Sequence, residues 1–142
     1  MREFLALAFV LASGIAHAET FEVQMLNRGE KGSMVYDPDF LRVAPGDTIR
    51  FVATTPGHNA RTIAGMAPEG AEEIKTPLGE TADVVAETPG IYGLKCSPHY
   101  AMGMVMMVAV GEEADPGAFE LPEGLPSRAR KRLEEIIAEN SK

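Results

Sequence analysis

The sequence predicts an all-β domain folded as an antiparallel sandwich, and three observations support this. Turn-forming groups of glycine, proline and asparagine recur at intervals typical of such a fold. The segments between them alternate apolar and polar residues, as strands with one buried face do. No segment before about residue 116 carries apolar residues at helical spacing. The turn signals are Asn27-Arg28-Gly29, Pro45-Gly46-Asp47, Pro56-Gly57, Pro68-Glu69-Gly70, Pro77-Leu78-Gly79 and Pro89-Gly90.

The expected strands can be placed by the side chains that share a face. A strand over residues 105–110 is apolar on both faces, which suits the middle of a sandwich. The other predicted strands carry Phe21, Val23 and Met25 on one face, Ile49, Phe51 and Ala53 on one face of a strand over 48–55, and the segment Ile91-Tyr92-Gly93-Leu94.

The C-terminal tail, about residues 116–140, changes to a helical pattern. Ser127 is the expected N-cap, and four apolar residues follow at helical spacing, which predicts a helix packed on the sandwich. They are Ala129, Leu133, Ile136 and Ile137. The basic residues on the other face are most simply explained as a solvated surface. These are Arg128, Arg130, Lys131 and Arg132.

Length and charge limit the possible functions. The chain has 142 residues, enough for one domain with its own core, and we expect a monomer. Its 21 acidic and 13 basic side chains give a net charge of −8, which argues against nucleic-acid binding because contacts to phosphates need a basic face.

Residues 1–18 have the pattern of a secretory signal peptide. The apolar run from Phe4 to Ala12 precedes Ala16-His17-Ala18, a typical cleavage sequence. The alternative, a membrane anchor, needs about 20 apolar residues, so no membrane insertion is expected. Cleavage would leave a domain over 19–142 with two histidines and one cysteine. An unpaired thiol in an oxidising compartment is a liability unless it is buried, joined to another chain or bound to metal.

The segment from Cys96 to Met104 carries most of the candidate chemistry. If Cys96 closes one strand and Met104 opens the next, their side chains emerge on the same face of a hairpin, and His99 lies on the connecting loop. His58, at the end of the strand over 48–55, is the one histidine left to complete the set. Two histidines, one cysteine and a nearby methionine form the ligand set of blue-copper electron-transfer sites, so the sequence predicts one copper ion.

Each of these residues, taken alone, also fits a common structural role. A lone cysteine is commonly a buried apolar residue, His58 could be a turn histidine, and methionines fill cores. Three such coincidences together are less probable than one metal site. Met104 fits the hairpin best as the axial ligand, whereas Met102 is expected on the surface beside His99, and Met106 and Met107 in the core.

The neighbours of these residues have predicted roles as well. Asn59 is expected to lock the Cys96 loop by hydrogen bonds and to donate its backbone N–H to the sulfur. Pro98 stiffens the loop and lacks an N–H that could donate to the sulfur. Both are equally compatible with being ordinary turn residues.

Two further functional classes fit these residues less well. A Cys–His hydrolase is disfavoured because the two histidines around the thiolate suit a metal better than a nucleophile with an oriented base. A copper chaperone or storage protein is the non-enzymatic alternative, supported by the methionine-rich segment 102–107.

The segments 96–104, Gly57-His58-Asn59 and Pro45-Gly46-Asp47-Thr48, with the helical tail, resemble the pseudoazurins, which are bacterial periplasmic cupredoxins. The resemblance implies an eight-stranded Greek-key β-sandwich with two C-terminal α-helices and one type 1 copper bound by His58, Cys96, His99 and Met104. It also implies electron transfer to denitrification enzymes, chiefly copper nitrite reductase, and exchange with c-type cytochromes and nitrous oxide reductase.

A docking face is expected around His99, because Pro98, Tyr100, Ala101 and Met102 give its imidazole an apolar rim. The resemblance adds that Met34 matches a non-ligand methionine near that histidine. A ring of basic residues is expected around the rim, although Pro56 stands where a lysine is common. Its candidates are Arg28, Lys31, Lys75 and Lys95.

Overall fold

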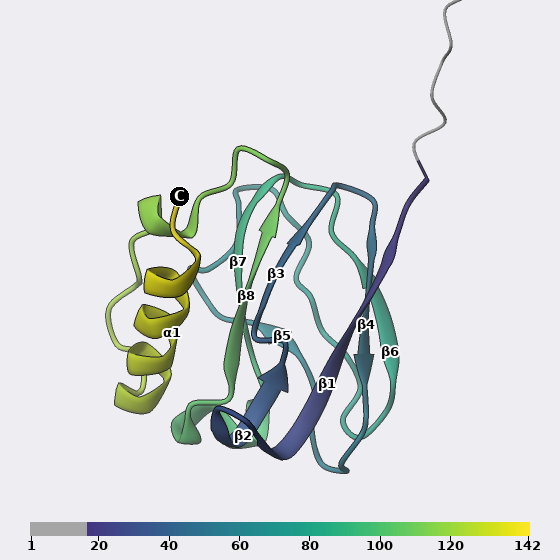
Figure 1. Cartoon of the computed structure of the whole chain (residues 1–142), viewed down its shortest axis with the longest axis vertical. Helices are drawn as coiled ribbons and strands as arrows, with labels where there is room; N and C mark the ends of the chain where they lie inside the picture. The colour runs from purple at the N-terminus through teal and green to yellow at the C-terminus, as the bar shows by residue number, and fades with distance from the viewer. Residues whose placement is uncertain (1–16) are drawn as a thin grey trace, which may run out of the picture.

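The computed structural model describes residues 17–142, so most of the predicted signal peptide lies outside the described residues. Eight strands form two four-stranded sheets that pack face to face (Figure 1). They are β1 (Thr20–Gly29), β2 (Gly32–Asp37), β3 (Phe40–Val43), β4 (Thr48–Val52), β5 (Arg61–Thr62), β6 (Ala82–Val85), β7 (Gly90–Lys95) and β8 (Val105–Val110). The predicted β-sandwich is therefore confirmed.

One sheet has the order β2-β1-β4-β6 and the other β3-β8-β7-β5. Most neighbours are antiparallel, but β1 with β4 and β3 with β8 are parallel pairs. The two strands of each parallel pair are not consecutive in the chain, because parallel strands need a long crossover connection between them. The predicted Greek-key connectivity stays a prediction.

The core between the sheets comes from the alternating positions identified in the sequence. Val23 and Met25 of β1 and Ile49 and Phe51 of β4 are all fully buried. All six residues of β8 are buried, as expected for a strand covered on both faces. The strand predicted over 48–55 ends as β4 at Val52, and an irregular segment follows it up to β5.

The tail contains a 3-10 turn, η2 (Pro116–Ala118), and one α-helix, α1 (Ser127–Asn140). Within residues 17–142 the expectation of two C-terminal α-helices is therefore wrong, because Pro122, Gly124 and Pro126 interrupt the stretch between η2 and α1. Ser127 is the first helical residue rather than the N-cap, which is Pro126.

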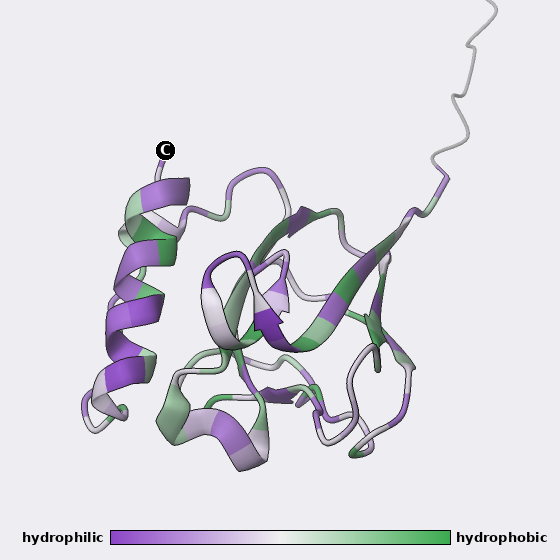
Figure 2. Ribbon diagram, turned by 60° about the horizontal axis from the view of Figure 1, so that its bottom comes forward, coloured by the Kyte–Doolittle hydropathy of each residue, from purple (hydrophilic) through white to green (hydrophobic). Residues whose placement is uncertain are grey.

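Helix α1 covers the outer face of the sheet that contains β8. Ala129, Leu133 and Ile136 are buried there in a second core cluster, together with Val105 and Met107. The outward side of the helix is mostly hydrophilic (Figure 2). In the part of the chain that the structure describes, no helix is both long and apolar enough to cross a membrane.

Candidate metal centre

The four candidate ligands gather at one end of the sandwich, although they come from two distant parts of the chain. His58 lies in the irregular segment after β4. Cys96 directly follows β7, His99 lies in the 3-10 helix η1 (Ser97–Met102), and Met104 directly precedes β8 (Figure 1). Pro98 starts η1, and Gly103 ends it with a positive φ of 89°, a conformation that favours glycine.

Three nitrogen and sulfur donors converge on one point. Nδ1 of His58 lies 3.1 Å from Nδ1 of His99, and Sγ of Cys96 lies 3.6 Å and 3.4 Å from these two atoms. The point equidistant from the three atoms is about 2.0 Å from each, close to the roughly 2.0–2.3 Å of zinc–nitrogen and zinc–sulfur bonds. This triangle therefore has the size that a first-row metal ion needs.

Met104 is held beside the other donors by its backbone. The N–H of Cys96 donates to its carbonyl at 3.0 Å, and its own N–H donates to the carbonyl of His99 at 3.2 Å. Its side chain is fully buried in the same core cluster as Cys96. Met102, by contrast, is 41% exposed on η1, as the sequence suggested. Met106 and Met107 are fully buried in the two cores, also as expected.

Asn27 fixes the orientation of the His58 ring, a role that was not expected from the sequence. Its Oδ1 lies 2.7 Å from Nε2 of His58. An amide oxygen can only accept, so Nε2 carries the hydrogen and Nδ1 presents its lone pair to the other donors. The pattern Asn27-Arg28-Gly29 suggested a turn, but these residues end β1, and the turn follows at residues 30–31.

Asn59 joins the His58 segment to the Cys96 loop. Its Oδ1 accepts from the backbone N–H of Ser97 at 2.8 Å, and its Nδ2 donates to the Ser97 hydroxyl at 3.2 Å. The hydroxyl of Tyr36 donates to the Asn59 carbonyl at 2.6 Å. Asn59 therefore makes the loop hydrogen bonds that the sequence suggested.

Burial shifts the pKa of two of the donors, Cys96 and His58. Burial raises the pKa of the Cys96 thiol, while the backbone N–H groups of Asn59 and His99 lower it. Two backbone N–H groups therefore act on the sulfur, those of Asn59 and His99, although Pro98 has no N–H to offer. Burial also lowers the pKa of His58, and the charge of His99 adds to this effect. A neutral imidazole is the form that binds a metal ion.

The residues expected at the docking face differ in their exposure and in whether their charges are paired. His99 is half-exposed among the exposed residues Pro98, Ala101 and Met102. Nζ of Lys95 lies 4.6 Å from the centre of the Tyr100 ring, which places this lysine beside the loop.

Of the remaining basic candidates, Lys31 is bonded to Glu139 and Asp39 at 2.8 Å and 3.0 Å, so its charge is neutralised. Arg28 and Lys75 are exposed. Met34 is half-buried and packs against the core cluster that contains Cys96 and Met104.

Comparison with known proteins agrees with this donor chemistry. The family model described as "Copper binding proteins, plastocyanin/azurin family" matches residues 23–111. A pseudoazurin from Methylorubrum extorquens is 49% identical over 110 residues, 77% of this chain and 74% of its own length. A pseudoazurin from Paracoccus pantotrophus is 40% identical over 94% of this chain and 92% of its own length.

Solved structures give the same result. The crystal structure of pseudoazurin from Methylobacterium extorquens AM1 aligns with a TM-score of 0.76 and 43% identity, covering 84% of this chain and 98% of that one. Native pseudoazurin from Hyphomicrobium denitrificans aligns with a TM-score of 0.73 and 35% identity, covering 87% and 99%. The chain thus belongs to the plastocyanin/azurin family of copper-binding proteins and, within it, to the pseudoazurins, electron-transfer cupredoxins that are not enzymes.

Proposed function

We propose that this protein is a periplasmic electron carrier with one type 1 copper ion held by His58, Cys96, His99 and Met104. The observation that carries the proposal is the triangle formed by the two Nδ1 atoms and Sγ, with edges of 3.1–3.6 Å. Two imidazoles, a thiolate and a neighbouring thioether are the donor chemistry of blue-copper sites. When bound, copper supplies a one-electron couple between Cu(II) and Cu(I).

The role of the protein is to keep the donor atoms in the same positions in the oxidised and in the reduced state of the site. Asn27 orients His58, and Asn59 ties the segment of His58 to the loop of Cys96. The backbone bonds between Cys96, His99 and Met104 close the other side. Donors fixed by surrounding hydrogen bonds move little, which keeps the reorganisation that accompanies electron transfer small.

Burial favours this function over a copper chaperone or storage protein. Cys96, Met104 and His58 have no exposed surface. A carrier that hands over the metal ion itself needs donors that an acceptor protein can reach. Here only the half-exposed His99 reaches the surface, which suits the transfer of an electron.

We infer that partners dock over His99. The exposed residues Pro98, Ala101 and Met102 give its imidazole an apolar rim, and transient redox contacts are small, below about 1,200 Å². Copper nitrite reductase and c-type cytochromes are the partners that the pseudoazurin resemblance implies. Arg28, Lys75 and Lys95 would attract an acidic partner, whereas the ion pairs of Lys31 remove it from this ring.

The proposed location rests on residues 1–18, whose pattern is that of a secretory signal peptide. Export to the periplasm and cleavage after Ala18 would leave a monomeric domain over 19–142. The N-terminal sequence of the protein purified from periplasmic extract tests this: it should start at Glu19, and an uncleaved Met1 in the cytoplasmic fraction would contradict it.

Ligand substitutions test the site. Cu(II) added to the purified protein should give an intense blue or green thiolate-to-copper absorption. Cys96→Ser should abolish this absorption and Met104→Leu should change it, whereas the matched control Met102→Leu should leave it as in the unchanged protein. An unchanged spectrum in Met104→Leu would refute the axial assignment.

Electron exchange tests the docking face. The rate with an acidic copper nitrite reductase should fall as ionic strength rises, because attraction between opposite charges is screened. Lys75→Gln and Lys95→Gln should lower the rate and weaken the salt dependence, whereas Lys142→Gln at the far C-terminus should not. A rate that rises with salt would show that the net charge of −8 governs the encounter instead.

A further inference from the structure

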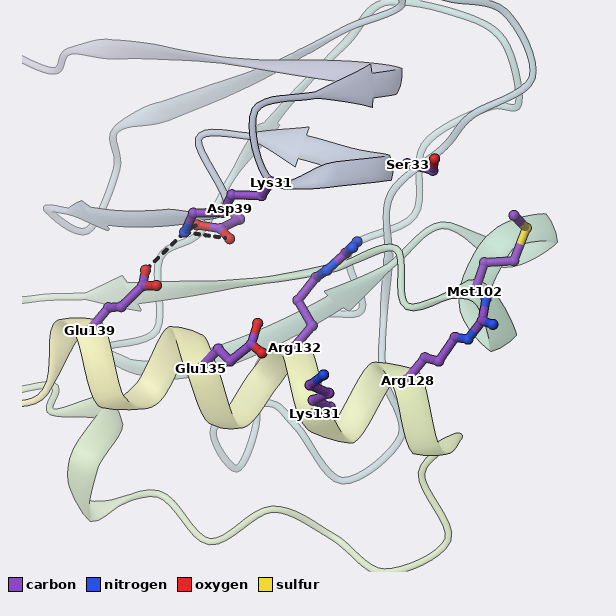
Figure 3. Close-up of a pocket in the computed structure, with 9 residues that line it drawn as sticks. All are labelled: Lys31, Ser33, Asp39, Met102, Arg128, Lys131, Arg132, Glu135 and Glu139. Atoms are coloured by element: carbon purple, nitrogen blue, oxygen red, sulfur yellow. Dashed lines mark hydrogen bonds and ion pairs between the residues drawn. The ribbon is translucent and has the colours of Figure 1, made fainter.

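Arg132 of α1 extends from the helix into a groove between α1, the turn after β1 and the end of η1 at Met102 (Figure 3). Its Nη1 donates to the carbonyl of Gly103 at 2.7 Å and to the carbonyl of Met34 at 2.8 Å. No carboxylate within residues 17–142 forms an ion pair with it. The two hydrogen bonds of this half-buried guanidinium therefore both go to backbone carbonyls, one of them next to the proposed ligand Met104.

The bond to Gly103 acts on the peptide unit that leads into Met104. The carbonyl of this unit belongs to Gly103 and accepts from Arg132, while its N–H belongs to Met104 and donates to the carbonyl of His99 at 3.2 Å. The peptide is thus held from both sides. This peptide is bonded covalently to Met104 and by a hydrogen bond to His99, so it connects two of the four proposed ligands. Its orientation therefore sets the position of the Met104 Cα, from which the side chain extends.

The bond to Met34 acts on a residue with unusual backbone geometry. Met34 has a φ of 54°, the one positive φ of a non-glycine residue in the described chain. Such a conformation persists only when the surroundings fix it. The Met34 side chain packs against the core cluster that holds Cys96 and Met104, so its backbone position also bears on the site.

Helix α1 gives Arg132 a fixed base. The next residue, Leu133, is fully buried, as is Ala129 one turn earlier. The helix also touches the ligand loop directly, because a Cβ at Gly103 would come within 3.1 Å of the Arg128 carbonyl oxygen. A shift of the helix would therefore be transmitted to the loop.

We propose that Arg132 is a positioning residue of the metal centre, through which α1 holds the peptide between His99 and Met104 and the backbone of Met34. This inference rests on the proposed function, since it concerns the placement of Met104 as the axial ligand. Without the guanidinium, the Gly103–Met104 peptide keeps one of its two restraints and the thioether position relative to Cys96 becomes less defined.

The test compares Arg132→Met with Arg128→Met in the full protein. Both changes remove one positive charge from the same helix and the same groove, but Arg128 is exposed and its side chain makes no hydrogen bond in the described chain. Arg132→Lys is the conservative variant, because an ammonium keeps the charge and can donate to one of the carbonyls. The readouts are amide hydrogen exchange at Met104, the ratio of the two thiolate-to-copper absorption bands, and the reduction potential.

Arg132→Met should speed exchange of the Met104 amide by about tenfold, as expected when a hydrogen bond to the same peptide is lost. It should also shift the band ratio and the potential, with Arg132→Lys between it and the unchanged protein, whereas Arg128→Met changes none of the three. Equal values in the two methionine variants would overturn the inference. If the unchanged protein gives no thiolate-to-copper absorption at all, the proposed function fails instead. Amide exchange in the metal-free protein then tests the backbone restraint by itself.

Discussion

Asn59→Ala is the most direct test of how the ligand loop is held in the absence of metal. The substitution deletes the acceptor for the Ser97 N–H, at 2.8 Å, and the donor to the Ser97 hydroxyl, at 3.2 Å. It leaves the Asn59 carbonyl in place to accept from Tyr36. The change therefore isolates the side-chain link between the two loops.

The expected cost follows from these two bonds. Both bonds lie in an exposed position. The shorter bond, to the backbone N–H, contributes about 1 kcal/mol, and the longer one adds a few tenths. Because Asn59 is half-buried, water replaces part of what is lost, so we expect the free energy of unfolding to fall by about 1 kcal/mol. For a domain of this size that corresponds to a melting temperature roughly 4 °C lower.

Urea unfolding of the metal-free protein measures this, with the midpoint expected to fall at an unchanged slope. Ser97→Ala is the matched control, because it removes the weaker bond alone and should cost less than about 0.5 kcal/mol. Hydrogen exchange of the backbone amide at position 97 should speed up in Asn59→Ala. In Ser97→Ala this amide keeps its bond to the Asn59 side chain and should stay equally protected. If Asn59→Ala unfolds like the unchanged protein and the Ser97 amide exchanges at its original rate, the side chain does not hold the loop.

Three further predictions concern the core and the donors. Gly93→Ala places a new Cβ against the side chain of the fully buried Met66, 2.9 Å from its Cβ and 2.7 Å from its Sδ. We expect this overpacking to cost about 1–3 kcal/mol in urea unfolding, and the double variant with Met66→Ala should reduce the cost. Equal stability of Gly93→Ala and the unchanged protein would contradict the contact. Burial raises the pKa of Tyr36 well above 10.0, so above pH 10 the unfolded chain loses a proton that the folded protein keeps. The free energy of unfolding should therefore fall by up to about 1.4 kcal/mol per pH unit in this range. Tyr36→Phe should show a dependence on pH that is weaker by this one proton, and an identical dependence would refute the assignment. Asn27→Ala removes the partner of Nε2 of His58 and should weaken copper binding by roughly 10–100-fold in competition with a chelator, whereas an unchanged affinity would mean that the ring needs no such support.

The sequence was sufficient to predict the candidate ligands because they are rare residue types with few possible partners. His58 and Cys96 are 38 positions apart, yet they could be paired because residues 19–142 contain two histidines and one cysteine. The strands could be predicted for a similar reason, since two-residue alternation, as in Val23 and Met25, follows directly from having one buried face.

Apart from the link that Asn59 makes to the Cys96 loop, the supporting contacts could not be predicted, because they join common residue types over long distances. Asn27 reaches His58 across 31 positions, and Arg132 reaches Met34 across 98, with nothing local in the sequence to mark either pair. The pairing of Lys31 with Glu139 likewise depends on where α1 lies, so its charge seemed available for docking. Local signals also misplaced the start of α1, since Ser127 was expected as the cap where Pro126 takes that position.

Titration of the purified protein with Cu(II), followed by reduction and reoxidation, tests the central claim most directly. If His58, Cys96, His99 and Met104 hold one copper ion for electron transfer, the intense thiolate-to-copper absorption saturates at about one equivalent, matching the single cysteine, ascorbate bleaches it, and an oxidant restores it in full. A colourless complex, or a colour that persists in Cys96→Ser, would contradict the claim.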